Sequence, residues 1–208
     1  MFLLSRYTFV FLVSLIWLSR SGTSHRYLGA LSSFEVWGNN ADLYISQGQP
    51  SLSLEGSLGG GGFFLTPSGR CIFYCLGTCR IDISLPKSTA TSVYLDTGNV
   101  FVDDVTDLYL RQGQGNVYLR GVERSDLFVY QGTIDALVSP NAQLKLYAQQ
   151  VHGEIFTLGD AYFYQVIHKG RLRIEEEEGE GQSVISLQYI DGQVLLLRDS
   201  LVKDFESP

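Results

Sequence analysis

Apolar and polar residues alternate over short stretches of this chain, and these stretches recur around glycines. Glycines at five positions are each followed, two positions later, by valine or isoleucine: Gly98, Gly115, Gly132, Gly153 and Gly192. The first four follow one another at intervals of 17, 17 and 21 (98 to 115, 115 to 132 and 132 to 153). Self-similarity at a nearly fixed period is typical of repeat architectures, in which successive units stack on one another. The pattern therefore predicts a stacked fold.

Each repeat has the pattern of two short strands around a glycine turn. In the first repeat, the strands Val93–Leu95 and Val100–Val102 flank Gly98. Because side chains alternate between the two faces of a strand, the aliphatic residues fall on one face, and Tyr94 and Phe101 on the other. A single unit cannot bury its aliphatic face, whereas a stack of units buries a continuous column. The sequence therefore predicts an all-β solenoid.

The segments at both ends of the array depart from the regular repeat. Residues Leu43–Leu54 resemble a degenerate N-terminal unit, and Leu172–Ile174 with Val184–Leu187 are typical of a hairpin. The last glycine unit, Gly192–Leu197, is expected to close the array, because the open ends of a stack must be capped. We expect one domain over residues 30–200, followed by a tail over residues 201–208.

The N-terminal segment has the features of a targeting signal. Arg6 provides a positive flank, and Phe9–Leu18 is a short apolar run with one serine. A membrane-spanning helix needs about 20 apolar residues, which is roughly twice the length of this run. A signal peptide within residues 1–24 is therefore predicted, with an uncleaved anchor as the alternative because no clear small-x-small cleavage site follows. We expect export to the periplasm, cell envelope or cell surface.

Composition and charge narrow the possible partners. The chain has 12 Tyr, 12 Phe and 22 Gly residues but one Met, which favours strands over helices. Its formal net charge of -7 argues against nucleic acid, because a phosphate partner requires clustered basic residues. Membrane contact is expected only through the N-terminal segment, if that segment is uncleaved.

The cysteines lie in one short stretch and are odd in number: Cys71, Cys75 and Cys79. If Cys71 and Cys75 lie on one extended strand, they are about 13 Å apart at roughly 3.3 Å per residue. That exceeds the limit of about 7 Å between disulfide Cα atoms. A three-residue hairpin loop at Leu76–Thr78 would place Cys75 opposite Cys79. We therefore predict a Cys75–Cys79 disulfide and a free Cys71, and regard zinc as a poor alternative because a fourth ligand is missing.

The order of these elements resembles adhesins of the head GIN-domain type and related short adhesin-like β-helix proteins of bacterial envelopes. The resemblance rests on the unit Leu43–Gly48, the strand Ile81–Pro86 and the glycine repeats from Gly98 to Ile155. It covers roughly residues 34 to 197 and implies an exported right-handed parallel β-helix without catalytic machinery. The chain departs from the family in its cysteine stretch and in glycine pairs reduced to Gln-Gly or Thr-Gly, which leaves the ligand open.

Outward aromatic residues are the candidate binding face. Tyr94, Tyr109 and Phe128 are expected at one register in successive repeats, with Tyr44 in the degenerate unit. Aromatic rings can stack on sugars, but they also stabilise neighbouring strands, by about 0.2 to 1 kcal/mol for each cross-strand pair. A stabilising ladder is the more common use of such residues, and a binding face for a glycan or protein is the alternative.

The acidic residues do not converge on a catalytic or metal site. Glu175–Glu178 has the pattern of a solvated acidic turn, and Asp103, Asp104 and Asp107 that of a polar loop, with a cation site as the second interpretation for each. The remaining candidates fall at different offsets from the repeat glycines: Asp96, Asp126, Asp135 and Glu154. The three histidines are scattered, and no hydrolase or phosphate-binding motif occurs. No catalytic residue, metal or cofactor is predicted.

These observations predict a non-enzymatic, exported, adhesin-like binding module of the cell envelope or surface. The alternative is a structural envelope protein that self-associates through the ends or edges of its stack. A carbohydrate-active β-helix enzyme is the third and least favoured interpretation, because it needs paired carboxylates that the sequence does not align.

Overall fold

A computed structural model describes residues 24–138, 143–158, 163–167, 170–175 and 182–198. These residues are all-β, with no helix among them, and so include none long and apolar enough to cross a membrane. The strands are β1 (Ser24–Tyr27), β2 (Ser33–Gln47), β3 (Ser51–Leu65), β4 (Arg70–Leu85), β5 (Ala90–Thr97), β6 (Val100–Asp103), β7 (Asp107–Arg120), β8 (Arg124–Val138), β9 (Gln143–Leu158), β10 (Phe163–Ile167), β11 (Gly170–Glu175) and β12 (Gln182–Arg198).

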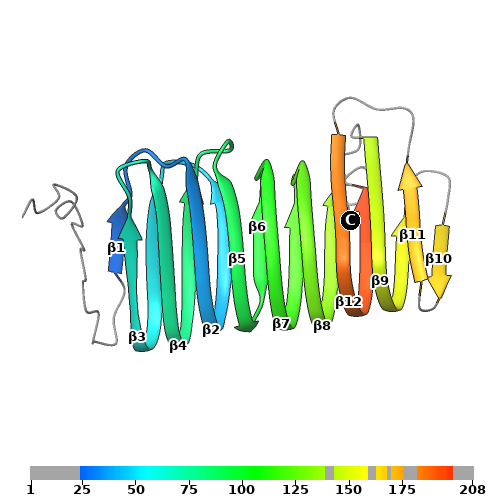
Figure 1. The fold of residues 1–208 in the computed structure, drawn as a ribbon, viewed down its shortest axis with the longest axis horizontal. Helices are drawn as coiled ribbons and strands as arrows, with labels where there is room; N and C mark the ends of the chain where they lie inside the picture. The colour runs from blue at the N-terminus through cyan, green and yellow to red at the C-terminus, as the bar shows by residue number, and fades with distance from the viewer. Residues whose placement is uncertain (1–23, 139–142, 159–162, 168–169, 176–181, 199–208) are drawn as a thin grey trace, which may run out of the picture.

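The middle strands stack in parallel along the long axis of the molecule (Figure 1). Neighbouring strands pair with the register of the sequence repeat: Val100 of β6 lies opposite Val117 of β7, and Val117 lies opposite Ile134 of β8. Both of these steps along the stack equal the interval of 17 between the first repeat glycines. The predicted pair of short strands is present as β5 and β6 in the first repeat and is fused into one long strand in β7 and β8.

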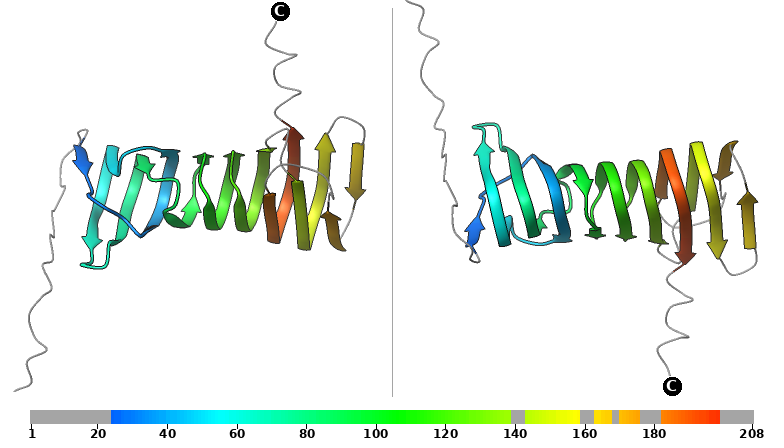
Figure 2. Two further views of the ribbon diagram at one scale, coloured as in Figure 1. Left: turned by 90° about the horizontal axis from the view of Figure 1, so that it is seen from above. Right: turned by 90° about the horizontal axis from the view of Figure 1, so that it is seen from below.

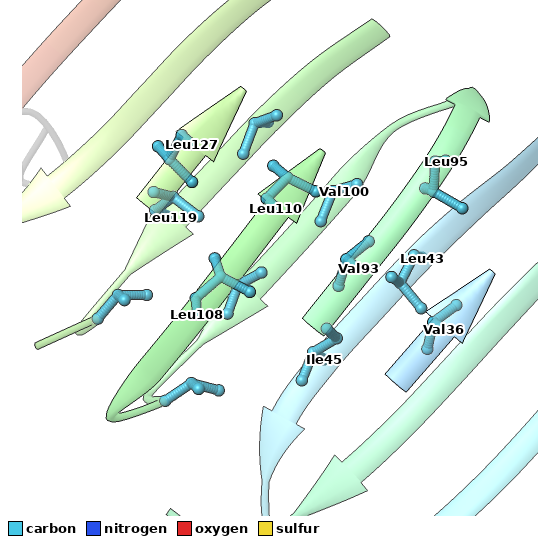
Figure 3. Packing of buried hydrophobic residues seen from close by; sticks show 14 of the residues in the cluster. Val36, Leu43, Ile45, Val93, Leu95, Val100, Leu108, Leu110, Leu119 and Leu127 are labelled. Carbon is cyan, nitrogen blue, oxygen red and sulfur yellow. The ribbon is translucent and has the colours of Figure 1, made fainter. Parts of the chain in front are cut away.

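Each long strand bends back on itself, so the stack has two layers (Figure 2). We call the part of each strand before the bend its first limb and the part after it the second limb. The side chains between the layers are aliphatic and buried (Figure 3). First limbs contribute residues such as Val93 and Leu110, and second limbs contribute Val100 and Val117, each with an exposed fraction of 0%. This column is the core that a single repeat could not bury.

The repeat glycines lie at the bends and form a column of their own. Their φ angles are positive, from 126° at Gly98 to 152° at Gly132. A Cβ atom added at Gly132 would overlap the carbonyl oxygen of Gly115 in the neighbouring strand. Glycine is required here both for the backbone conformation and for the close approach of adjacent strands.

The order of strands differs from the order of the chain at the C-terminal end. β12 lies between β8 and β9 and is parallel to both, with Gly192 opposite Gly132 on one side and Gly153 on the other. β11 pairs antiparallel with β9. The predicted capping hairpin, and the closure of the array by the last glycine unit, are therefore wrong. β12 fits inside the stack because its Gly192 aligns with the glycines of both neighbouring strands. Its aliphatic residues, such as Leu187 and Val194, are buried in the core.

The N-terminal end is also rearranged. β2 lies between β4 and β5, parallel to both, and Leu43–Ile45 pairs with Val100–Val102 of β6. The predicted degenerate unit Leu43–Leu54 is thus divided between β2 and β3. The end of the stack is formed by β3 and β1, which pair antiparallel with β4 and β3. The predicted targeting segment lies outside the described residues except for Ser24, and the tail over residues 201–208 lies outside them entirely.

Candidate functional site

Outward aromatic rings form a continuous line on the first limbs. Trp37 of β2 stacks on Tyr94 of β5, with ring centroids 4.1 Å apart and planes 9° apart. Tyr94 contacts Tyr109 of β7 at 5.6 Å, and Tyr109 contacts Phe128 of β8 at 5.8 Å, both in tilted geometry. The structure therefore brings Tyr94, Tyr109 and Phe128 together. We call the surface formed by these four residues and Tyr130 the Trp37 face.

The three predicted rings do not share one register. Tyr94 lies opposite Arg111, and Arg111 lies opposite Phe128. Tyr109 lies two positions earlier on β7, opposite Ser92 and Asp126, so its ring reaches its neighbours diagonally. The expectation of a single column was wrong. The step between repeats is 17 residues, as from Gly98 to Gly115, so the residue of β7 that corresponds to Tyr94 is Arg111 and not Tyr109.

A groove of about 510 Å³ opens on the Trp37 face. Its rim includes large apolar side chains that are unusually exposed, among them Trp37 and Leu76 at 47% and Tyr130 at 42%. Gly113 and Arg111 also line it. Arg111 donates a hydrogen bond of 2.9 Å to the Tyr130 hydroxyl. The groove therefore combines exposed rings with one positively charged side chain.

A second aromatic ladder lies on the second limbs. Tyr44 stacks on Phe101 at 4.5 Å, and Phe101 stacks on Tyr118 at 4.6 Å, with planes within 5° of parallel in both pairs. The Arg80 guanidinium covers the outer face of Tyr44, 4.1 Å from the ring centroid. Tyr44 therefore belongs to this ladder and not to the Trp37 face. Because its rings cover one another, the Tyr44 ladder mainly stabilises neighbouring strands.

Asp135 of β8 lies opposite Tyr118 of β7, at the position that follows the last ring of the Tyr44 ladder. It lines a groove of about 460 Å³ together with Tyr118 and Asp103. Burial raises the pKa of the Asp135 carboxyl above its ordinary value of 3.8. Asp103, by contrast, lies 3.6 Å from Arg120 in an ion pair. The two acids thus have different environments within one groove.

The raised pKa of Asp135 gives a testable pH dependence. An acid whose pKa is higher in the folded than in the unfolded state lowers stability as the pH rises through the interval between the two values. We expect Asp135→Asn to be more stable than the parent protein at about pH 7 and equally stable at about pH 3, where the carboxyl is neutral in both states. Urea unfolding at the two pH values measures this difference. Equal stability at neutral pH would contradict it.

The cysteine stretch is part of a strand and not of a hairpin. Cys75 and Cys79 form a disulfide within β4, and their Cα atoms are 7.4 Å apart. The predicted loop at Leu76–Thr78 is wrong: the strand instead bends at Gly77, where φ is 115°, and this bend shortens the distance between the two cysteines. Cys71 is free and buried. Burial raises the pKa of its thiol to about 12, so the thiol stays protonated at neutral pH.

The acidic loop residues are paired with basic side chains. Asp104 lies 2.9 Å from Lys87, and Asp107 lies 2.6 Å from Arg124. The hydrogen bond from Lys87 to Asp104 raises the pKa of the Lys87 ammonium. No group of three potential ligands suited to a metal ion occurs within the described ranges. Residues 176–178 of the acidic turn lie outside those ranges.

Sequence reasoning missed Trp37, Arg111 and Tyr130, although a signal was available. The repeat step is 17 residues, as from Gly98 to Gly115. Counting 17 residues on from Tyr94 gives Arg111, and counting 17 on from Gly113 gives Tyr130. The same step relates Phe101 to Tyr118. Trp37 could not be placed in this way, because β2 lies outside the regular period and joins the stack between β4 and β5.

No family model matches the sequence, and no curated protein matches it. Among solved structures, the chain is similar to one described as a putative cell adhesion protein from Clostridium sporogenes, with a TM-score of 0.54 and 10% sequence identity. The match covers 86% of this chain and 100% of that chain. A structure described as a putative adhesin from Bacteroides fragilis matches with a TM-score of 0.41 and 10% identity, over 85% of this chain and 95% of that one. At such identity the first match shows a shared fold, and the second supports no argument.

Proposed function

We propose that the chain is a non-enzymatic, adhesin-like binding module that contacts its partner through the Trp37 face. The observation behind this proposal is the grouping of exposed large apolar side chains around one groove, with Trp37 and Tyr130 both more than two-fifths exposed. Tryptophan, tyrosine and arginine are the residues most enriched at the energetic centres of interfaces. Exposed apolar patches on otherwise polar surfaces mark interaction sites.

The proposal includes the architecture and location that suit such a module. The architecture we propose is a right-handed parallel β-solenoid, and the parallel register and the glycine column at the bends support its parallel stacking. Export to the envelope or surface is supported by the apolar segment at residues 9–18 and by the disulfide, which is typical of oxidising compartments. A long, flat stack of strands offers an extended side surface for attachment.

Truncation of the exposed tryptophan tests this function. We expect Trp37→Ala to weaken binding to a glycan array or to immobilised surface proteins by at least about tenfold, because interface centres lose about 2 kcal/mol or more on truncation. Tyr118→Ala, on the opposite layer, is the matched control and should bind as the parent does. If both variants bind equally well to every ligand that the parent captures, the Trp37 face is not the contact surface.

Self-association is the second candidate function, and the edge of the sheet favours it. In the order of the described strands, β1 lies at one end of the sheet and β10 at the other. A strand at the edge of a sheet can pair with a strand from another copy. Sedimentation as a monomer across a wide concentration range would exclude this assembly. The carbohydrate-active enzyme remains the least favoured alternative, because it needs two carboxylates across one site, whereas the candidate acids Asp96, Asp126 and Asp135 line three different grooves.

A further inference from the structure

Arg111 differs from the other basic side chains that the structure describes. Five of them lie within ion-pair distance of a carboxylate: Arg70, Arg80, Lys87, Arg120 and Arg124. Arg111 instead donates to the neutral hydroxyl of Tyr130, and its guanidinium carbon lies 5.6 Å from the centre of that ring. Within the described part of the chain, its positive charge therefore has no acidic partner, although the protein as a whole is acidic.

Adjacent strands approach closely at Gly113, which lines the groove together with Arg111. Register pairs on either side place Gly113 between Asp96 of β5 and Tyr130 of β8. A Cβ at Gly113 would overlap the carbonyl oxygen of Asp96, so no larger residue fits this strand spacing. The groove at this close approach is lined by Arg111 and by Tyr130, whose side chain is 42% exposed. The hydrogen bond to the Tyr130 hydroxyl holds the Arg111 guanidinium in the groove.

The remaining lining indicates what kind of anion would fit. Arg111 offers one guanidinium, which matches one carboxylate by charge-assisted hydrogen bonds. Trp37, Tyr94 and Tyr130 offer apolar ring surface, while Asn39 and Asp96 offer an amide and a carboxylate suited to hydroxyl groups. A densely anionic ligand would be repelled by Asp96 and by the net charge of -7. A hydroxyl-rich ring with a single carboxylate fits all of these groups.

We propose that this groove binds a glycan through a sugar residue that carries a carboxylate, with Arg111 as the group that recognises the acid. This inference rests on the proposed function, since it names the class of ligand for the same face. The aromatic rim supplies contact area, and Arg111 supplies the discrimination between an acidic and a neutral sugar. An acidic peptide is the competing ligand, and the experiment below distinguishes the two.

The test is a calorimetric titration of the full chain with 3′-sialyllactose and with its methyl ester, which has the same shape without the charge. We expect the acid to bind at least about tenfold more tightly, because the hydrogen bonds between a guanidinium and a carboxylate are charge-assisted and stronger than those to a neutral ester. Arg111→Gln should abolish this preference, and Arg120→Gln, on the opposite layer, should keep it. Thermal unfolding of both variants checks that they fold.

Three results would overturn the inference: equal binding of acid and ester, absence of binding to both, or an acid preference that persists in Arg111→Gln. Binding of a glutamate-rich peptide as tight as that of the sugar acid would also overturn it, in favour of a protein partner. Failure of the proposed function is distinguishable from these results. If Trp37→Ala still weakens capture of some other surface ligand, the binding face stands and only the acidic-sugar assignment fails.

Discussion

Replacing Gly132 by alanine is expected to destabilise the protein by between about 2 and 5 kcal/mol. An L-residue with a left-handed backbone costs roughly 1 to 2 kcal/mol, and the φ of Gly132 is 152°. The new Cβ would also overlap the Gly115 carbonyl oxygen, and overpacking typically costs about 1 to 3 kcal/mol. Because every bend stacks on the next, the strand cannot move away without opening the ladder. Urea unfolding measures the loss.

Gly29 provides the matched control for this prediction. Its φ is also positive, at 72°, but a Cβ added there would meet nothing within 4 Å. Gly29→Ala should therefore cost only the backbone term, about 1 to 2 kcal/mol. The difference between the two variants isolates the close approach of strands at the bend. Equal destabilisation by both would show that the glycine column is a matter of backbone conformation alone.

Placing a charge on the buried face of β12 is expected to have the second large effect. Val194 has an exposed fraction of 0% and lies between Ile134 of β8 and Ile155 of β9. Val194→Asp removes apolar burial worth roughly 1.5 to 3 kcal/mol and introduces an unpaired buried carboxyl. We expect a loss of about 4 kcal/mol or more, at the upper end for single substitutions. If β12 were a peripheral strand, the loss would be much smaller.

The adjacent residue supplies the control for the β12 prediction. Gln193 points to the other side of the same strand and is exposed. Gln193→Asp should change stability by no more than about 0.5 kcal/mol, as surface substitutions usually do. A comparable loss in both variants would mean that the aspartate acts on the strand itself rather than through burial.

The regular part of the fold was predictable because the sequence repeats its packing requirements. The constant step between repeats, the inward aliphatic residues and the glycines at the bends all follow from one constraint, the stacking of identical strands. The candidate face was predictable in part: Tyr94, Tyr109 and Phe128 do lie together, but diagonally. Using the repeat step strictly would have placed Arg111 at the position expected for Tyr109.

The order of the strands was not predictable, because the register of a glycine unit does not specify its neighbours. Either Gly192 or Gly153 could lie next to Gly132, because both units have the same pattern around the glycine. The distance between the units along the sequence does not show which of the two becomes the neighbour. The same holds for β2, which joins the stack between β4 and β5 and thereby places Trp37 next to Tyr94. The functional face thus depends on a topological choice made by tertiary packing.

In this structure the glycine units stack in one parallel register with β12 between β8 and β9. Engineered disulfides test this arrangement directly, with Thr133 paired either with Gln193, its neighbour in β12, or with Glu154, which lies beyond β12. Neighbouring strands are about 4.8 Å apart, and strands two positions apart are about twice that distance, beyond the limit of about 7 Å between the Cα atoms of a disulfide. Peptide mapping after mild oxidation should show the cross-link in Thr133→Cys/Gln193→Cys and none in Thr133→Cys/Glu154→Cys. The reverse result would mean that the units stack in chain order and would contradict the account.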